Sequence, residues 1–276
     1  ANVDMTGYAF MPITTFSGSF DGKGFTIDNL NANNIGQPGS LINTLSTGST
    51  FKNTVFSNIN LTGATAGLIN SAGAAVITIQ DIRITSGTVN ATTQAGALAV
   101  SAGAATISRC SSAASVSGFG DVGGLVATMN SGSISQSKFS GTVTETAGNV
   151  GGLVGHAYNA STIANSYATG SVNGGSAGGL VGYFQTSAGS SITNSYSTGA
   201  VTGSATLGGF TATDSGFGTR TSCHWDTTTS GQAASAAGTG HITADMKAQA
   251  TFTGWDFAII WSINEGVAYP KLQWEP

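Results

Sequence analysis

Residues 149–172 read NVGGLVGHAYNASTIANSYATGSV, and residues 176–201 read SAGGLVGYFQTSAGSSITNSYSTGAV, so the chain gives one pattern twice in close succession. Both copies run from GGLVG through an Ile to an Asn-Ser-Tyr triplet and end on Thr-Gly-x-Val. Self-similarity at a fixed period is typical of proteins built from stacked repeats. The pair therefore predicts a repeat architecture, provided that the period extends along the chain.

The GGLVG element recurs along most of the sequence at intervals of 27–30 residues. Its apolar residue stands at Leu68, Leu98, Leu125, Leu153, Leu180 and Phe210. A second signal is in phase with it, because four copies place Ile and Val nine residues apart, as Ile107 with Val116, Ile134 with Val143, Ile163 with Val172, and Ile192 with Val201. Each period therefore contains at least two short β segments, separated by Gly, Ser and Asn turn clusters.

Short strands at this period, with no helical pattern between them, exclude an alternating βαβ sheet. They predict an all-β fold, a single-stranded right-handed parallel β-solenoid (β-helix) with coils of about 28 residues. Stacked strands lie about 4.8 Å apart, so roughly eight to ten coils would form a rod about 40–50 Å long. The glycines are expected to turn the backbone with positive φ and to let coils approach closely. A phosphate-binding loop does not fit, because GGLVG recurs, lacks Lys and precedes strands.

The chain divides into three parts: opening coils at residues 1–60, the regular solenoid at 61–212 and a C-terminal cap at 213–276. The cap holds all four tryptophans, and we expect this aromatic cluster to cover strand edges that would otherwise recruit another chain. A sugar-binding platform is the alternative interpretation of the cluster. The cap also contains the only segment with a helical pattern, TADMKAQATF, with Thr243 as N-cap and Asp245 in the first turn.

Composition argues against several classes of partner. The chain has 276 residues, of which 7% are charged, and no run of about 18 apolar residues, so we expect no direct membrane insertion. Eight scattered basic residues and a net charge of −4 predict no nucleic-acid partner, because phosphate contacts need clustered Lys and Arg. The sequence starts at Ala1 without a charged n-region and an apolar h-region, so no signal peptide is visible, as expected for a processed or trimmed secreted chain.

No catalytic or metal-binding pattern is recognisable. A glycosidase needs two carboxyl groups about 5–9.5 Å apart, whereas the regular coils place no acids in register, and the loose groupings are Asp21 with Asp28 and Asp214 with Asp226. Asp21, in FDGKG, is interpreted as a turn-stabilising residue. There is no GxSxG elbow, no zinc-ligand spacing and no calcium-binding nonapeptide repeat, and the histidines fall at different phases of the repeat, at His156, His224 and His241. We therefore expect no enzyme, no cofactor and no metal.

Two columns of side chains align from coil to coil. Lys138, Tyr167 and Tyr196 form the candidate site for a ligand or partner, provided that the column faces water; a structural aromatic stack is the alternative. A second column, interpreted as an amide ladder, consists of Gln136, Asn165 and Asn194. Cys110 shares a column with serines and Cys223 lies in the cap, so we expect no disulfide between them.

The pattern GGLVG, followed by Ile, Asn-Ser-Tyr, Thr-Gly and Val, resembles the GLUG motif that is repeated in bacterial surface and secreted proteins, including filamentous-haemagglutinin-like adhesins. FSGSFDGKGFTIDNL at residues 16–30 resembles the segment that opens such arrays, and CHWDTTTSGQ and FTGWDFAIIWSINEGVAYPKLQW resemble the segment that closes them. The copies around Leu68 and Leu98 depart from the pattern. The resemblance implies a surface or adhesive role and carries over no catalytic residue.

These observations predict a non-enzymatic, adhesin-like module, secreted or at the bacterial cell surface, in which a rigid solenoid presents or spaces a binding face. The expected partner is a glycan or a surface protein, and self-association through the faces or ends of the solenoid is a further expectation. A carbohydrate-active β-helix enzyme or phage-type depolymerase is the alternative from another class. An ice-binding protein is a third, although regular T-x-T columns do not persist from coil to coil.

Overall fold

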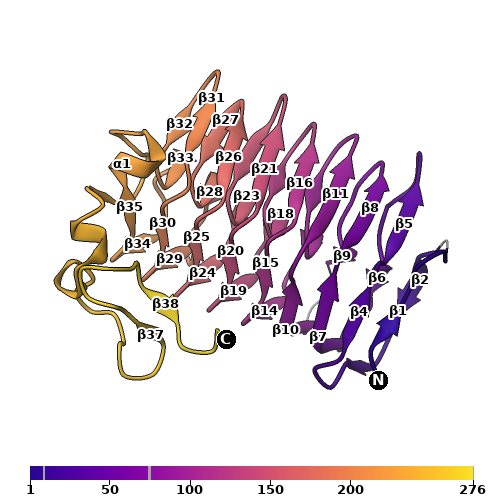
Figure 1. Cartoon of the computed structure of the whole chain (residues 1–276). Coiled ribbons are helices and arrows are strands. Elements are labelled where there is room, and N and C mark those ends of the chain that lie inside the picture. The colour runs from indigo at the N-terminus through magenta and orange to yellow at the C-terminus, as the bar shows by residue number, and fades with distance from the viewer. Residues whose placement is uncertain (9, 74–75, 276) are drawn as a thin grey trace.

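The computed structural model describes residues 1–8, 10–73 and 76–275 and has the form of a rod of stacked coils (Figure 1). Its strands pair in parallel along the rod, apart from one antiparallel pair near the C-terminus. The longest regular ladder contains eight strands, one from each successive coil. The all-β parallel solenoid predicted from the repeat is therefore confirmed.

Four parallel sheets line the rod. The eight-stranded sheet contains β2 (Ile13–Phe16), β6 (Ile42–Leu45), β9 (Ile69–Ala72), β13 (Ala99–Ala102), β18 (Val126–Asn130), β23 (Val154–Asn159), β28 (Val181–Thr186) and β33 (Thr211–Asp214). The seven-stranded sheet contains β5 (Asn31–Asn34), β8 (Ile59–Gly63), β11 (Gly87–Ala91), β16 (Ser115–Gly118), β21 (Thr142–Glu145), β26 (Ser171–Gly174) and β31 (Val201–Gly203). The five-stranded sheet contains β12 (Ala95–Gly96), β17 (Val122–Gly123), β22 (Asn149–Gly151), β27 (Ser176–Gly178) and β32 (Leu207–Gly208).

The sixteen-stranded sheet is the widest, because two neighbouring strand columns join through long early strands. It contains β1 (Val3–Asp4), β3 (Ser19–Asp21), β4 (Thr26–Asp28), β7 (Thr50–Ser57), β10 (Thr78–Ile84), β14 (Thr106–Ser108), β15 (Ser111–Ser112), β19 (Ser133–Ser135), β20 (Lys138–Phe139), β24 (Thr162–Ala164), β25 (Tyr167–Ala168), β29 (Ser191–Thr193), β30 (Tyr196–Ser197), β34 (Thr219–Thr221), β35 (His224–Asp226) and β36 (Thr239–His241). Because parallel pairing continues to His241, the last coil lies inside the segment that the sequence assigned to the cap.

The register of the strands follows the sequence repeat. Val154 pairs with Val181, Ile163 with Ile192, and Val172 with Val201. Their side chains are buried, as are the leucines of the GGLVG copies, so identical repeat positions stack into one continuous apolar core. A single coil has too little apolar surface to form a core, and the stacking therefore stabilises the fold.

The second glycine of each GGLVG copy allows neighbouring coils to approach closely. A Cβ atom added at Gly152 would lie 2.2 Å from the carbonyl oxygen of Gly179, and one added at Gly179 would lie 2.1 Å from that of Gly209. The expected close approach is thus present. The expected positive φ is wrong here, because Gly152 and Gly179 do not adopt the left-handed region.

Positive φ occurs instead at a tight turn that recurs once per coil. A residue other than glycine has φ between 45° and 56° at Asn53, Asp81, Arg109, Gln136, Asn165, Asn194 and Ser222. The predicted Gln136–Asn165–Asn194 column is therefore a turn column, but its ladder is formed by the backbone, with N–H groups donating to carbonyls of the next coil at 3.0 Å. The Trp261 indole donates to Asn165 Oδ1 at 3.4 Å, and the structure describes no amide–amide bond among these three side chains.

The helix expected at residues 243–252 is wrong as a single α-helix. Two 3₁₀ helices, η1 (Asp245–Lys247) and η2 (Gln249–Thr251), occupy the segment, because Ala248 between them is extended, with φ −107° and ψ 125°. Thr243 is not an N-cap, since Ala244 precedes η1 without a side-chain cap. The one α-helix described, α1 (Thr227–Ser230), begins after Asp226, whose carboxylate accepts from the N–H groups of Thr228 and Thr229.

Residues 245–275, here named the C-terminal strap, turn back along the sixteen-stranded sheet and carry the antiparallel pair β37 (Trp261–Ser262) and β38 (Lys271–Leu272) (Figure 1). The Trp274 indole donates to the Gln136 carbonyl at 2.9 Å, so the strap extends past the end of the rod and over several coils. Within the described residues, no helix is long and apolar enough to cross a membrane.

Candidate functional site

The predicted Lys138–Tyr167–Tyr196 column is a real column of the sixteen-stranded sheet. Lys138 pairs with Tyr167, and Tyr167 pairs with Tyr196. The column continues to His224 on the C-terminal side. On the N-terminal side it continues through Ser111 to Arg83.

The two tyrosines are covered by the C-terminal strap. They are 6% and 1% exposed, and their rings stack with centroids 4.8 Å apart beneath Trp261, whose ring lies 6.0 Å from each. Tyr196 donates to the Pro270 carbonyl at 2.6 Å, and Tyr167 donates to Glu275 Oε1 at 2.7 Å. Burial raises the pKa of both hydroxyls well above the usual range, so both act as neutral donors. The candidate site at Tyr167 and Tyr196 required a column that faces water, and this condition is not met. The alternative, a structural aromatic stack, is the one observed: the tyrosines dock the strap and do not offer a surface to a ligand.

The strap is fastened at its end by Glu275. One carboxylate oxygen accepts from Lys138 Nζ in an ion pair, and the other accepts from Tyr167 and from the Leu272 N–H. The side chain of Glu275 is 6% exposed, and that of Lys138 is 25% exposed. Lys138, the third residue of the predicted site, is thus the only one of the three that still reaches the surface.

A slot of about 200 Å³ opens directly beyond the strap. Its polar lining comes from Arg83, Thr85, Ser111, Ser112, Lys138 and Ser140, and Trp274 of the strap forms one wall. A second hollow shares Arg83 with this slot and extends the groove toward the N-terminal coils, where Lys23, Asn53 and Asp81 line it. Of the residues that line this groove, Lys138 was predicted from the sequence, whereas Arg83 was not. The repeat copies around Leu68 and Leu98 depart from the pattern, so the pairing of Arg83 in β10 with Ser111 in β15 could not be predicted from them.

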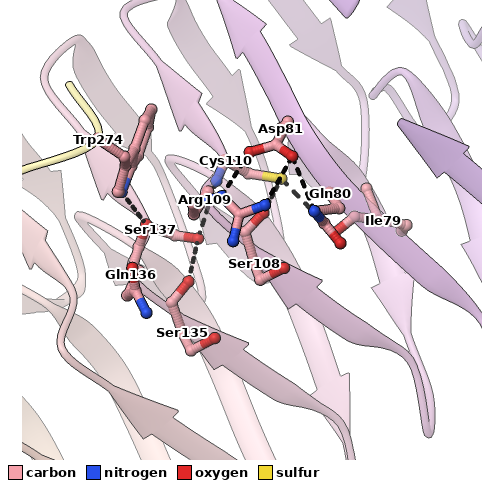
Figure 2. Close-up of polar contacts among 10 residues, drawn as sticks. All are labelled: Ile79, Gln80, Asp81, Ser108, Arg109, Cys110, Ser135, Gln136, Ser137 and Trp274. Atoms are coloured by element: carbon pink, nitrogen blue, oxygen red, sulfur yellow. Dashed lines mark hydrogen bonds and ion pairs between the residues drawn. The ribbon is translucent and has the colours of Figure 1, made fainter. Parts of the chain in front are cut away.

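Beside the slot, Asp81 and Arg109 form a two-pronged ion pair in the turn column (Figure 2). Arg109 Nε donates to Asp81 Oδ1 at 2.6 Å, and Nη2 donates to Oδ2 at 2.8 Å. Partial burial opposes ionisation of Asp81, but the bonds from Arg109 and Gln80 outweigh it and lower the pKa of the carboxyl. Asp81 therefore neutralises Arg109. Among the three cations that line the slot and the second hollow, Lys23, Arg83 and Lys138, Arg83 is the one without a carboxylate partner in the described ion pairs.

The acids considered for catalysis are each held by local partners. The Asn53 amide and the Lys23 N–H lower the pKa of Asp21 to about 2. Asp28 accepts from the Ser57 hydroxyl at 2.6 Å. Asp214 forms an ion pair with Arg220, and Asp226 is the N-cap of α1. Each of these acids therefore has a local role in a turn, a hydrogen bond, an ion pair or a helix cap.

Two of the three histidines lie together under the strap. His224 Nδ1 is 3.1 Å from His241 Nε2, and Phe252 and Trp255 of the strap pack on the His224 ring. Burial and the neighbouring His241 lower the pKa of His224 to about 4. Across residues 1–8, 10–73 and 76–275, no three side chains of His, Cys, Asp or Glu gather as metal ligands.

The third histidine belongs to a cluster that sequence reasoning missed, named here the outer aromatic patch: His156, Tyr158, Tyr183, Gln185 and Asp121. The His156 ring stacks on Tyr183 with centroids 4.9 Å apart and lies 5.1 Å from Tyr158. Its Nε2 is 3.1 Å from Gln185 Oε1, and its Nδ1 is 3.4 Å from Asp121 Oδ2. The sequence feature that indicates this cluster is the alignment of HAY at residues 156–158 with YFQ at residues 183–185, each directly after a GGLVG copy.

The column that holds His156 and Tyr183 otherwise contains small hydroxyl residues. Going from the N-terminus, register places Thr15, Thr44, Ser71, Ser101 and Thr128 before His156, and Thr213 after Tyr183. Aromatic rings at the surface of the eight-stranded sheet are thus concentrated on β23 and β28.

The cysteines are separate, buried thiols. Cys110, Ser137, Ser166 and Ser195 form an internal ladder in which each N–H donates to the next hydroxyl at 3.1 Å (Figure 2 shows its beginning). Cys223 extends the same column, four strands from Cys110, and four spacings of about 4.8 Å far exceed the reach of a disulfide. Burial raises the pKa of both thiols to about 12, so neither is a reactive thiolate.

Comparison with known proteins supports the resemblance stated from the repeat. Residues 146–173 match the family model described as "The GLUG motif", which confirms that the chain carries this repeat. A Gly-rich membrane protein of Evansella cellulosilytica is 34% identical over 134 residues, which are 47% of this chain and 12% of that protein. Halomucin of Haloquadratum walsbyi is 35% identical over 124 residues, 45% of this chain and 1% of that protein. The matches thus span only a small part of these relatives.

A crystal structure of a candidate immunoglobulin A1 protease from Bacteroides ovatus is similar to the whole chain. The superposition covers 100% of this chain and 84% of the other, with a TM-score of 0.65 and 20% sequence identity. At this identity the likeness supports the solenoid fold alone.

Proposed function

We propose that the chain is a non-enzymatic, adhesin-like module, secreted or displayed at the cell surface, whose solenoid presents a binding face to a glycan or protein partner. The relatives named as a membrane protein and as halomucin support a surface or extracellular setting. The structure supports a rigid presenting element, because continuous parallel ladders and a shared core leave the rod few ways to bend.

The observation that carries the proposal is the outer aromatic patch. Half-buried aromatic rings on β23 and β28 interrupt a column of Ser and Thr, so they offer apolar surface at one place on an otherwise small-side-chain sheet. Gln185 and Asp121 add an amide and a carboxylate at the edge of the rings. An apolar platform rimmed by hydrogen-bonding groups suits the faces of a sugar or a polar protein surface.

Parallel stacking also holds the patch in a fixed shape. The His156 ring stacks on Tyr183, and Gln185 and Asp121 contact the two nitrogens of that ring. Asp121 in turn accepts a hydrogen bond from the Asn149 amide at 2.8 Å. Partial burial opposes ionisation of Asp121, yet the bonds from His156 and Asn149 lower its pKa. A preorganised platform loses little conformational entropy when a ligand binds, which favours affinity.

The test is binding of the purified chain to an array of bacterial, algal and host glycans and surface proteins, with Tyr183→Ala compared with Tyr8→Ala. Tyr8 is 67% exposed on the opening coils and serves as the matched control. We expect a specific ligand whose affinity falls at least about tenfold in Tyr183→Ala, as for an interface anchor, and is unchanged in Tyr8→Ala. Equal binding by both variants, or release of a cleavage product from any arrayed glycan, would contradict the proposal.

A further inference from the structure

Most basic residues of this weakly acidic chain lie on one sheet or its turns, and three of them line the groove: Lys23, Arg83 and Lys138. Of eight Lys and Arg residues, the five that precede residue 219 all belong to the sixteen-stranded sheet or its turns: Lys23, Lys52, Arg83, Arg109 and Lys138. Three carboxylates pair with four of them: Asp21, Asp81 and Glu275. Arg83 lies between the two hollows of the groove and is lined up with Ser111 and Lys138. The described lining of the slot holds two cations, Arg83 and Lys138, and no Asp or Glu, and a concave surface with one sign of charge attracts ligands of the opposite sign.

The strap shows how a carboxylate is held in this column. Glu275 forms an ion pair with Lys138 and accepts a hydrogen bond from the hydroxyl of Tyr167, which is next to Lys138 in the column. The next cation in the same direction is Arg83, two strand spacings from Lys138, or about 10 Å. Arg83 therefore stands where a second carboxylate would be received, and its planar guanidinium can hold both oxygens at once.

The lining of the slot distinguishes between classes of acidic ligand. Between the cation and the strap lie hydroxyl groups of Thr85, Ser111, Ser112 and Ser140, and the Trp274 indole forms a wall. The strap itself, a polypeptide, docks through large buried side chains that include Trp261 and Leu272, and the slot offers no comparable apolar pocket. The strands that line the slot are paired on both sides, so an extended peptide would find no free sheet edge.

We propose that the slot bounded by Arg83, Ser111, Lys138 and Trp274 binds an acidic saccharide. The sugar carboxylate is received by Arg83, the sugar hydroxyls by the serines and threonine, and an apolar face of the ring by Trp274. The volume of about 200 Å³ suits one hexuronic acid unit, and the adjoining hollow at Lys23 and Asn53 leaves room for the next unit of the chain. This site lies on a different sheet from the outer aromatic patch and does not depend on it.

The experiment measures binding of trigalacturonate by calorimetry and compares it with the same trimer after reduction of its carboxyl groups to alcohols. Arg83→Gln removes the receiving cation. Ser111→Tyr fills the slot without a change of charge, at a position whose column already contains stacked tyrosines. Lys271→Gln is the matched control, because it removes the same charge from an exposed residue outside the lining. Unchanged melting temperatures verify that the variants are folded.

We expect the trimer to bind and the reduced trimer, Arg83→Gln and Ser111→Tyr each to lose at least about tenfold in affinity, while Lys271→Gln stays within about twofold. Tyr183→Ala should leave this affinity unchanged, which separates the slot from the outer aromatic patch. Four results would overturn the proposal: no binding of the trimer, equal binding of the reduced trimer, equal losses in Arg83→Gln and Lys271→Gln, or preferential binding of hexaglutamate, which would indicate a peptide site.

Discussion

Acid should loosen the C-terminal strap, because two histidines are paired beneath it. His224 is 8% exposed, contacts His241 at 3.1 Å and is covered by Phe252 and Trp255. Burial, followed by proximity to His241, lowers the pKa of His224 from 6.5 to about 4. Between these values the unfolded chain binds more protons than the folded chain, so the stability present above pH 6.5 is lost as the pH falls toward 4. At about 1.4 kcal/mol per pH unit, the loss is about 3 kcal/mol.

The assay is urea unfolding at a series of pH values, followed by tryptophan fluorescence, because the strap contains Trp255, Trp261 and Trp274. His224→Phe keeps an aromatic ring in the column and removes the buried titration, so its stability should fall by about 3 kcal/mol less than that of the wild type between pH 7 and pH 4. Tyr8→Phe, a change at an exposed residue of the opening coils, should behave as the wild type. Asp226 and the Lys138–Glu275 pair are the same in the wild type and in both variants, so the comparison between the pH profiles isolates His224. Parallel pH profiles for His224→Phe and the wild type would refute the reasoning.

Two further predictions concern packing. Trp261→Ala should weaken strap docking by about 3–5 kcal/mol, because it empties a fully buried site, and hydrogen exchange should then increase in residues 245–275 but not in the early coils. Gly152→Ala should destabilise the solenoid by about 3 kcal/mol or more, because its Cβ meets the Gly179 oxygen at 2.2 Å. Gly120→Ala, whose nearest neighbour would be 3.6 Å away, should change the denaturation midpoint little. Equal effects of the two glycine variants would contradict the steric explanation.

The repeat carries enough information to predict the core and the register. A solenoid stacks equivalent positions, so the 29-residue separation of Ile163 from Ile192 and of Val172 from Val201 translates directly into strand pairing. The same logic places Lys138, Tyr167 and Tyr196 in one column. Spacing within the repeat therefore determines which residues are neighbours along the rod.

Spacing does not determine what lies over a column. The side-chain alternation of a strand is the same whether its outer face contacts water or another segment, and the bond from Tyr167 to Glu275 joins residues 108 positions apart. The strap also lacks the repeat, so no equivalent copy indicates its path. The wrong prediction of an α-helix at residues 243–252 has a similar cause. The two 3₁₀ helices on either side of extended Ala248 place Met246 and Phe252 in the buried cluster of the strap, and local helix propensity does not include such tertiary contacts.

The outer column of the sixteen-stranded sheet changes its chemistry where its cover ends. Under the strap it presents His224 and the tyrosines, which supply apolar area and neutral hydrogen-bond donors. At Lys138 it becomes cationic and receives the last carboxylate of the strap, and beyond it Ser111 and Arg83 face the open slot. Each coil contributes one side chain to this column without a change in the core. A substitution there can therefore alter what the face binds while the ladders that hold the rod together stay the same.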